Sequence, residues 1–131
     1  MANELYAVLG TSKDYSLLAG TGTETEIGVA LAPGNGVVER GTIIKKGENG
    51  LYAPAATGTL SGGECAVLMS DTDTGAEGTG VAPSAAAFRT GRFLTGKAKL
   101  ASGELSAADV LELRRQGIIF DGMSGTLNNE V

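Results

Sequence analysis

Few side chains in this sequence could carry catalytic or metal-binding chemistry, and none stands in a complete motif. The 131 residues include no histidine, which removes the commonest general base, the usual metal ligand and every Ser-His or Cys-His pair. Asp71-Thr-Asp73 resembles the start of a calcium-binding loop. The next ligand position holds Gly75, the required glycine is replaced by Ala76 and the closing glutamate by Ala82. The residue types therefore predict no metal, no cofactor and no enzyme.

The nucleophile and nucleotide patterns are also incomplete. Cys65 is the only cysteine, so no internal disulfide can form, and its apolar neighbours as far as Met69 predict a buried, inert thiol. Gly20-x-Gly22 lacks the third glycine of a dinucleotide fingerprint, and Gly122-Met-Ser-Gly125 lacks the last glycine of a nucleophile elbow. Paired carboxylates can work without histidine, so a small acidic β-barrel enzyme or ligand-binding domain stays open as an alternative.

The charge balance argues against nucleic-acid and membrane partners. The net charge is −5 and the pI about 4.6, whereas phosphate binding needs clustered basic side chains. The largest basic group, Arg89, Arg92, Lys97 and Lys99, is flanked by glycines rather than by stacking aromatics, so we interpret it as a solvated or subunit-facing edge. No apolar run approaches the roughly 20 residues of a membrane-spanning helix, and the first residues do not resemble a signal peptide. We expect a protein that is made in the cytosol.

Most of the chain that would position these side chains has the pattern of β-strands joined by turns. Glycine supplies 21 residues and aromatics only 5%, so the core must be aliphatic. Alternating apolar residues predict a strand that begins at Glu26 and includes Ile27, Val29 and Leu31. Asn49-Gly50 predicts a hairpin turn between strands at 41–46 and 51–53.

Two further strands follow in the second half. The run Cys65–Met69 is the most apolar and predicts a central strand, whereas residues 71–83 have the composition of a loop. Residues 85–94 predict a strand or strand pair, with a bulge or bend at Gly91. The fold class is therefore mainly β.

One short helix is predicted near the carboxyl end. Ser106 can cap its start, with Asp109 three residues on as in a capping box. Arg114 and Arg115 suit the last turn, and Gly117 suits a left-handed stop. The apolar residues 118–120 follow, and residues 122–131 are a polar tail that we expect to be mobile.

The first residues stand apart from this periodic body. Residues 1–25 combine apolar patches with a flexible polar linker, and this predicts either an arm that orders on a partner or a frayed terminus. The apolar residues that such an arm would use are Leu5, Tyr6, Val8, Leu9, Tyr15, Leu17 and Leu18. The expected organisation is an arm over 1–25, a β-rich domain over 26–121 and a tail over 122–131.

Five segments occur in an order that resembles a known family. They are Leu18-Ala-Gly20 leading into Thr25-Glu-Ile-Gly-Val-Ala-Leu31, Glu39-Arg-Gly-Thr-Ile-Ile44 followed by Asn49-Gly-Leu-Tyr52, Glu64-Cys-Ala-Val-Leu68 leading into Asp71-Thr-Asp73, Phe88-Arg-Thr-Gly-Arg-Phe93, and Val110-Leu-Glu-Leu-Arg-Arg-Gln-Gly-Ile-Ile-Phe120. Together they resemble the lambda-type head decoration proteins of tailed phages, over roughly residues 18 to 120. The Arg-Gly-Thr strand and the helix ending in Gly-Ile-Ile-Phe are the most specific parts.

The resemblance implies a β-tulip-like barrel with one short helix and an extended N-terminal arm. It implies homotrimers at local three-fold sites on the outer capsid surface of the virion, an arm that reaches the major capsid protein, and no catalysis. The protein would stabilise the expanded head against the pressure of packaged DNA.

Within that interpretation, the segment from Phe88 to Lys99 is the candidate for one subunit interface. Its cations could face carboxylates of a neighbouring subunit, and we assign Arg89, Arg92 and Phe93 to this contact. A different virion or tail component, such as a tail-tube or spike-tip domain, is the other alternative.

Overall fold

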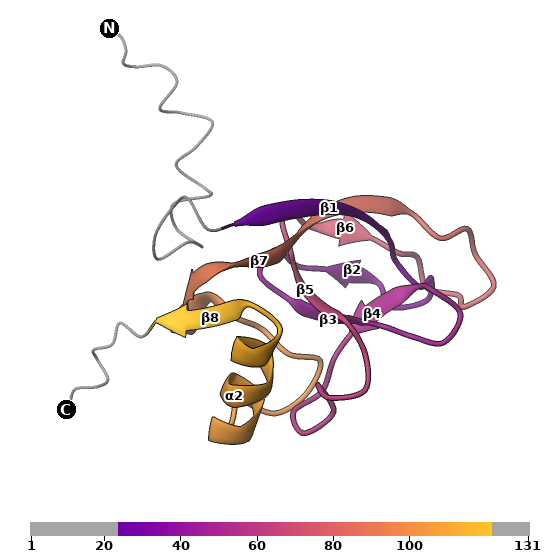
Figure 1. Ribbon diagram of the computed structural model, residues 1–131. Coiled ribbons are helices and arrows are strands. Elements are labelled where there is room, and N and C mark those ends of the chain that lie inside the picture. Colours follow the sequence, from indigo (N-terminus) through magenta and orange to yellow (C-terminus); the bar gives the residue numbers. More distant parts are fainter. Residues whose placement is uncertain (1–23, 122–131) are drawn as a thin grey trace, which may run out of the picture.

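The described part of the chain is a small, mainly β body with one short helix, which confirms the predicted fold class (Figure 1). The computed structural model describes residues 24–121, so the predicted arm before Glu24 and the predicted tail after Asp121 lie outside the described residues. The elements are β1 (Thr25–Ala30), β2 (Val37–Val38), β3 (Ile43–Lys46), β4 (Tyr52–Pro54), β5 (Cys65–Leu68), β6 (Thr72–Asp73), β7 (Ser84–Leu94), a 3-10 turn (Thr95–Lys97), α2 (Ala107–Arg115) and β8 (Ile118–Asp121).

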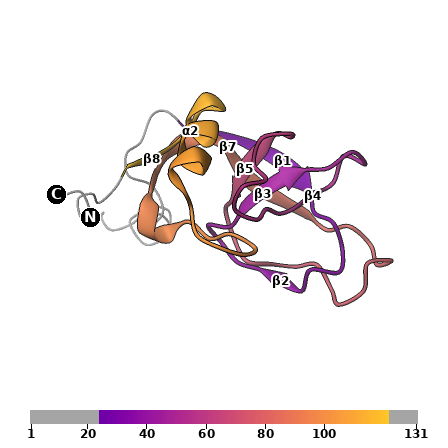
Figure 2. The ribbon, with the colours of Figure 1, turned by 90° about the horizontal axis from the view of Figure 1, so that it is seen from below.

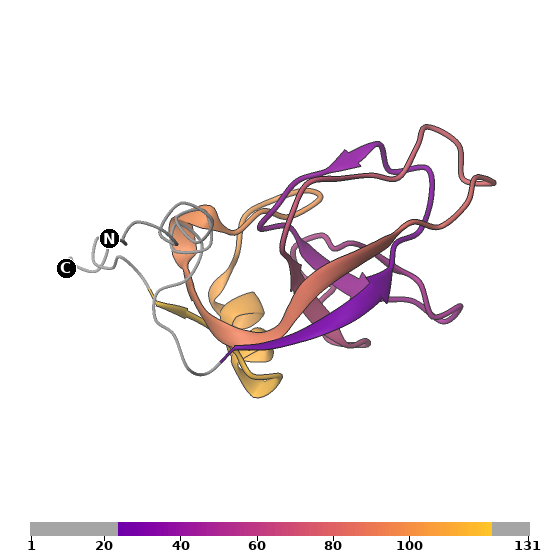
Figure 3. The same cartoon turned by 90° about the horizontal axis from the view of Figure 1, so that it is seen from above.

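One sheet carries most of the strands. Its order is β1-β7-β5-β3-β4, and all of these neighbours pair antiparallel. β8 joins β7 in parallel, while β2 and β6 form a separate antiparallel pair. Figure 3 shows this pair standing away from the long ribbons of β1 and β7.

The sheet is not closed into a barrel, which corrects the barrel expectation. The two edge strands approach each other only at an isolated bridge between Leu31 and Tyr52. β4 is three residues long, so it is too short to follow β1 along its length. A gap in the hydrogen-bonded sheet therefore remains between β1 and β4.

β5 is the central strand, as its apolar sequence predicted, and all four of its residues are buried. Successive side chains of a strand point to opposite faces, and β5 accordingly contributes to two cores. Cys65 and Val67 join the core under α2, and Ala66 and Leu68 join the core on the other face. Tyr52 and Val38 close that second core.

β7 is one long strand that changes partners at Gly91, where the sequence predicted a bulge or bend. Its first part pairs with β1 and its last four residues pair with β8. Gly91 has a φ of +150°, which side-chain-bearing residues rarely adopt. A Cβ at this position would lie 2.9 Å from the ring of Phe93, so glycine is required by both the backbone and the packing.

α2 has the predicted capping signals. The Ser106 hydroxyl accepts from the Asp109 N–H at 3.1 Å, and the Asp109 carboxylate accepts from the Ser106 N–H at 2.9 Å. Gly117 follows with a φ of +93°, and the chain then returns along β7 as β8. Figure 2 shows α2 and β8 together at one end of the body, with β2 towards the other.

The strand pair β2–β6 was not expected, because residues 71–83 were predicted to form a loop. Each strand is two residues long, and two residues are too few to show a period of two. The rest of that segment is turn and irregular structure.

Candidate functional site

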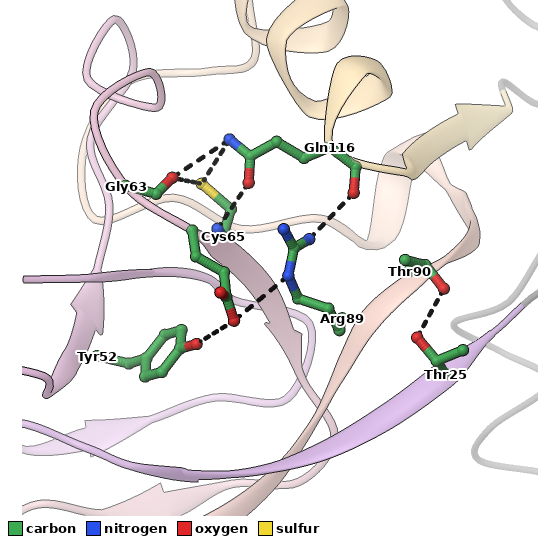
Figure 4. Close-up of polar contacts among 8 residues, drawn as sticks. Thr25, Tyr52, Gly63, Cys65, Arg89, Thr90 and Gln116 are labelled. Atoms are coloured by element: carbon green, nitrogen blue, oxygen red, sulfur yellow. Dashed lines mark hydrogen bonds and ion pairs between the residues drawn. The ribbon is translucent and has the colours of Figure 1, made fainter.

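Polar side chains gather where α2 ends, and they join the helix to β5, β7 and β4 (Figure 4). Gln116 lies at the centre of this group of side chains, which we call the Gln116 cluster. The cluster consists of Gln116, Glu112, Arg89, Glu64 and Tyr52. The Gln116 side-chain oxygen accepts from the Cys65 N–H at 2.8 Å. Its amide nitrogen donates to the carbonyls of Leu60 and Gly63 and to the Glu112 carboxylate. One amide side chain therefore holds the loop that enters β5.

Arg89 of β7 extends the Gln116 cluster across the sheet. Its guanidinium donates to the main-chain carbonyl of Gln116 at 3.0 Å and lies 3.3 Å from the Glu64 carboxylate. The Tyr52 hydroxyl donates to the same Glu64 oxygen at 2.5 Å. Burial, and then this hydrogen bond, raise the pKa of Tyr52 to about 12. The phenol therefore stays protonated as a donor and is unsuited to act as a base.

Cys65 is buried beside the same cluster, as predicted, with no exposed surface. Its sulfur lies 3.5 Å from the Leu60 carbonyl. Burial raises the pKa of the thiol, although a hydrogen bond from Gln116 acts in the opposite direction. A buried protonated thiol is a poor nucleophile, so Cys65 is unsuited to nucleophilic attack.

A second polar cluster lies at the other end of α2 and centres on Asp109, which is only 3% exposed. Besides capping the helix, its carboxylate accepts from the Thr57 hydroxyl at 2.5 Å and from the Gly58 N–H at 2.9 Å. Burial alone would raise the pKa of Asp109, but the hydrogen bonds from Ser106, Thr57 and Gly58 outweigh it and lower the pKa to about 2. Asp109 is therefore an ionised anchor, not a proton donor at neutral pH.

The structure places the predicted interface residues in different environments. Arg89 belongs to the Gln116 cluster, with 26% of its side chain exposed, and Arg92 is exposed. Phe93 is fully buried, with its ring centroid 5.5 Å from that of Phe88 and 5.7 Å from that of Phe120. Its side chain is part of the core of a single subunit, which corrects its assignment to a contact between subunits.

The arm residues of the prediction lie outside the described residues. They are Leu5, Tyr6, Val8, Leu9, Tyr15, Leu17 and Leu18.

The surface of the body has shallow hollows. One of about 470 Å³ runs along residues 96–105, and another of about 510 Å³ lies over β1 and the start of β7.

Among residues 24–121, no group of three or more Cys, Asp or Glu side chains is arranged to hold a metal ion. Asp71 and Asp73, the calcium-like pair, accept from the main-chain N–H groups of Arg40 and Gly75. None of the helices in this range is long and apolar enough to span a membrane.

No protein-family model and no curated protein matches this chain.

Proposed function

We propose that this chain is a capsid decoration protein of the lambda type. It binds the outer surface of expanded phage heads as trimers at local three-fold sites and stabilises them against the pressure of packaged DNA. One observation carries the proposal: the five segments that resemble this family occur in the family's order. Four of them contain all or part of the strands β1, β3, β5 and β7, and the fifth contains the end of α2 and most of β8.

The most specific of these segments, Val110–Phe120, has a clear physical role in the fold. Leu113, Ile118 and Phe120 from this segment are buried in the core under α2. Gln116 and the left-handed Gly117 turn the chain from the helix into β8. The resembling residues therefore include those on which the packing of α2 depends, and this supports a shared fold.

The body also has features that suit a protein under mechanical load. Both ends of α2 are hydrogen-bonded to the stretch that precedes β5, through Asp109 and Gln116. β7 adds the contact from Arg89 to the last turn of the helix. Such cross-links between distant parts of the chain resist local opening, as a clamp between capsomers requires.

The geometry suggests which end of the body faces the capsid. β1 starts beside Thr90, and β8 ends beside Leu94 of the same strand. The start of β1 therefore lies at the end of the body that carries β8 (Figure 1). In the proposal this end lies against the major capsid protein, and the β2–β6 end points outward.

The test is decoration of purified expanded heads, imaged with and without the protein. The full chain should add density at the three-fold sites and raise the temperature at which the heads burst. A variant lacking residues 1–20 should keep a folded body but decorate far less, because three arms per trimer multiply a weak contact. Heads that gain no density from the full chain would refute the proposal, and undiminished binding by the truncated variant would refute the role of the arm.

A further inference from the structure

Among residues 24–121, no strand pairs with the outer edge of β1. Within this described part of the chain, β1 is an end strand of the sheet and pairs only with β7. The Leu31 N–H donates to the Pro83 carbonyl at 2.9 Å, so the main-chain groups of Leu31 point towards β7. The direction of the main-chain groups alternates along a strand, so those of Val29 and Ile27 point towards β7 as well. The main-chain groups of Glu26, Gly28 and Ala30 must then point away from β7.

Two further bonds support this assignment. The Ala86 carbonyl accepts from the Met69 N–H at 3.1 Å, so Ala86, the partner of Gly28, faces β5 and not β1. The next outward residue, Ala32, donates to the Tyr52 carbonyl of β4 at 2.8 Å. Among residues 24–121, the main-chain groups that point outward are thus bonded to another strand only at Ala32, where β4 reaches them. Those of Glu26, Gly28 and Ala30 lie along the open edge of β1 (Figure 3).

The surface beside this edge is recessed, because Gly28 and Ala86 carry little or no side chain there. A Cβ placed on Gly28 would meet no atom within 4 Å, and its partner is the exposed Ala86. The hollow of about 510 Å³ lies here, lined by residues 26–28 and 84–86. The only charged residue in the lining is Glu26, which is exposed.

We propose that the β1 edge binds an extended segment of the major capsid protein as an added strand. This inference depends on the proposed function, and it concerns the folded body and not the arm. An added strand would bond to the outward groups of Glu26, Gly28 and Ala30. Its recognition sequence has a large apolar side chain opposite Gly28, lying in the hollow, and Lys or Arg two residues away, opposite Glu26.

The same geometry argues against a second copy as the occupant. Two β1 edges that pair with each other form a two-fold, isologous contact. Such a contact uses one patch on both subunits and cannot close a three-fold ring. The chain's own residues 1–23 are the other possible occupant, and the experiment separates them from the capsid protein.

The primary test is hydrogen exchange of individual amides in the full chain, free and bound to expanded heads. In the free protein at low concentration, the amides of Glu26, Gly28 and Ala30 should exchange fast, while those of Ile27 and Val29 are protected. On heads, Gly28 and Ala30 should become protected as well. Protection of these amides already in the free protein would assign the edge to residues 1–23, and protection that appears only at high concentration would assign it to a second copy; either result overturns the proposal.

Two substitutions give an independent readout. Gly28→Pro removes the outward donor without removing a bond to β7 and should weaken binding to heads at least about tenfold, with melting of the free protein checked in parallel. Glu26→Lys should weaken binding by up to about fivefold. Glu48→Lys, the same change on the exposed β3–β4 turn, is the matched control and should not.

These outcomes separate the inference from the function on which it depends. If the full chain does not decorate heads, the proposed function fails. If it decorates heads while the β1 amides stay unprotected and both variants bind normally, the function stands and the strand-docking site is refuted.

Discussion

The two ends of helix α2 hold the same stretch of chain, residues 57–65, with different chemistry. At the amino end, the ionised carboxylate of Asp109 accepts from Thr57 and Gly58. At the carboxyl end, the neutral amide of Gln116 bonds to Leu60, Gly63 and Cys65. A carboxylate only accepts hydrogen bonds, whereas an amide both donates and accepts. Each end therefore matches the main-chain groups that it faces.

Because Asp109 is charged and Gln116 is neutral, we expect the amino end of α2 to contribute more to stability and to be sensitive to pH, unlike the carboxyl end. Hydrogen bonds to a charged group contribute roughly 1.5–3 kcal/mol, about twice as much as neutral ones. At the amino end, the buried charge of Asp109 accepts several hydrogen bonds. At the carboxyl end, the side chain of Gln116 is neutral, and the ion pair between Arg89 and Glu64 lies next to it. Four predictions test this contrast.

The largest effect should come from Asp109→Ala. The change removes the helix cap and leaves the N–H groups of Gly58 and Ser106 without their acceptor. We expect the free energy of unfolding to fall by about 3–5 kcal/mol, measured by chemical denaturation. Glu104→Ala, an exposed acidic residue shortly before the helix, is the control and should change stability by less than about 0.5 kcal/mol. A small effect at Asp109 would show that its bonds contribute little.

Gln116→Ala should come second. It leaves the main-chain N–H of Cys65 unsatisfied, and we expect a loss of about 2–3 kcal/mol. The loop before β5 should also open more often, so a thiol reagent should label Cys65 faster than in the wild type, where labelling is slow until denaturant is added. Arg115→Ala, on the exposed side of the same turn, should leave the labelling rate unchanged. Equal rates in wild type and Gln116→Ala would contradict the role of the amide.

The sequence predicted the two ends unequally, and the reason is sequence distance. The pair Ser106 and Asp109 is a local capping signal, so the helix start could be read directly. The contacts of Asp109 to Thr57 and of Gln116 to Cys65 span 52 and 51 residues, and no local pattern encodes them. Cys65 was predicted as buried because a continuous apolar run needs no partner to be recognised.

The remaining differences have the same origin. Phe93 was assigned to a surface because it stands among cations, but it lies in the core under α2 together with Phe88, five residues earlier. The register of β7 shifts between Phe88 and Thr90, so the alternation of the strand could not have placed Phe93. The open sheet could not be predicted either, because closure depends on how far β4 extends along β1. The pairing of β2 with β6 joins residues 34 and 36 positions apart, and each strand is too short to be recognised by itself.

The third prediction concerns pH and separates the two ends of α2 directly. The pKa of Asp109 is about 2 in the folded protein, below its ordinary value of 3.8. Its contribution is therefore fully present above about pH 4 and is lost as the pH falls through 2. The stability difference between wild type and Asp109→Asn should shrink by up to about 2 kcal/mol between pH 5 and pH 2. The difference between wild type and Gln116→Ala should change less, because the amide does not titrate.

The last prediction extends the contrast to the cations next to the carboxyl end. Arg89→Glu loses the bond to the Gln116 carbonyl and places a second carboxylate beside Glu64, and it should destabilise the body by about 1–2 kcal/mol. Arg92→Glu changes a more exposed side chain and should destabilise the body less than Arg89→Glu does. Reduced decoration of heads by Arg89→Glu could thus reflect a weakened body, whereas reduced decoration by Arg92→Glu at unchanged stability would identify a subunit contact. Arg92→Lys, which keeps the charge, should then restore binding. If Arg92→Glu decorates heads with the affinity of the wild type, the 88–99 segment does not form the interface, and the trimer must use another face of the body.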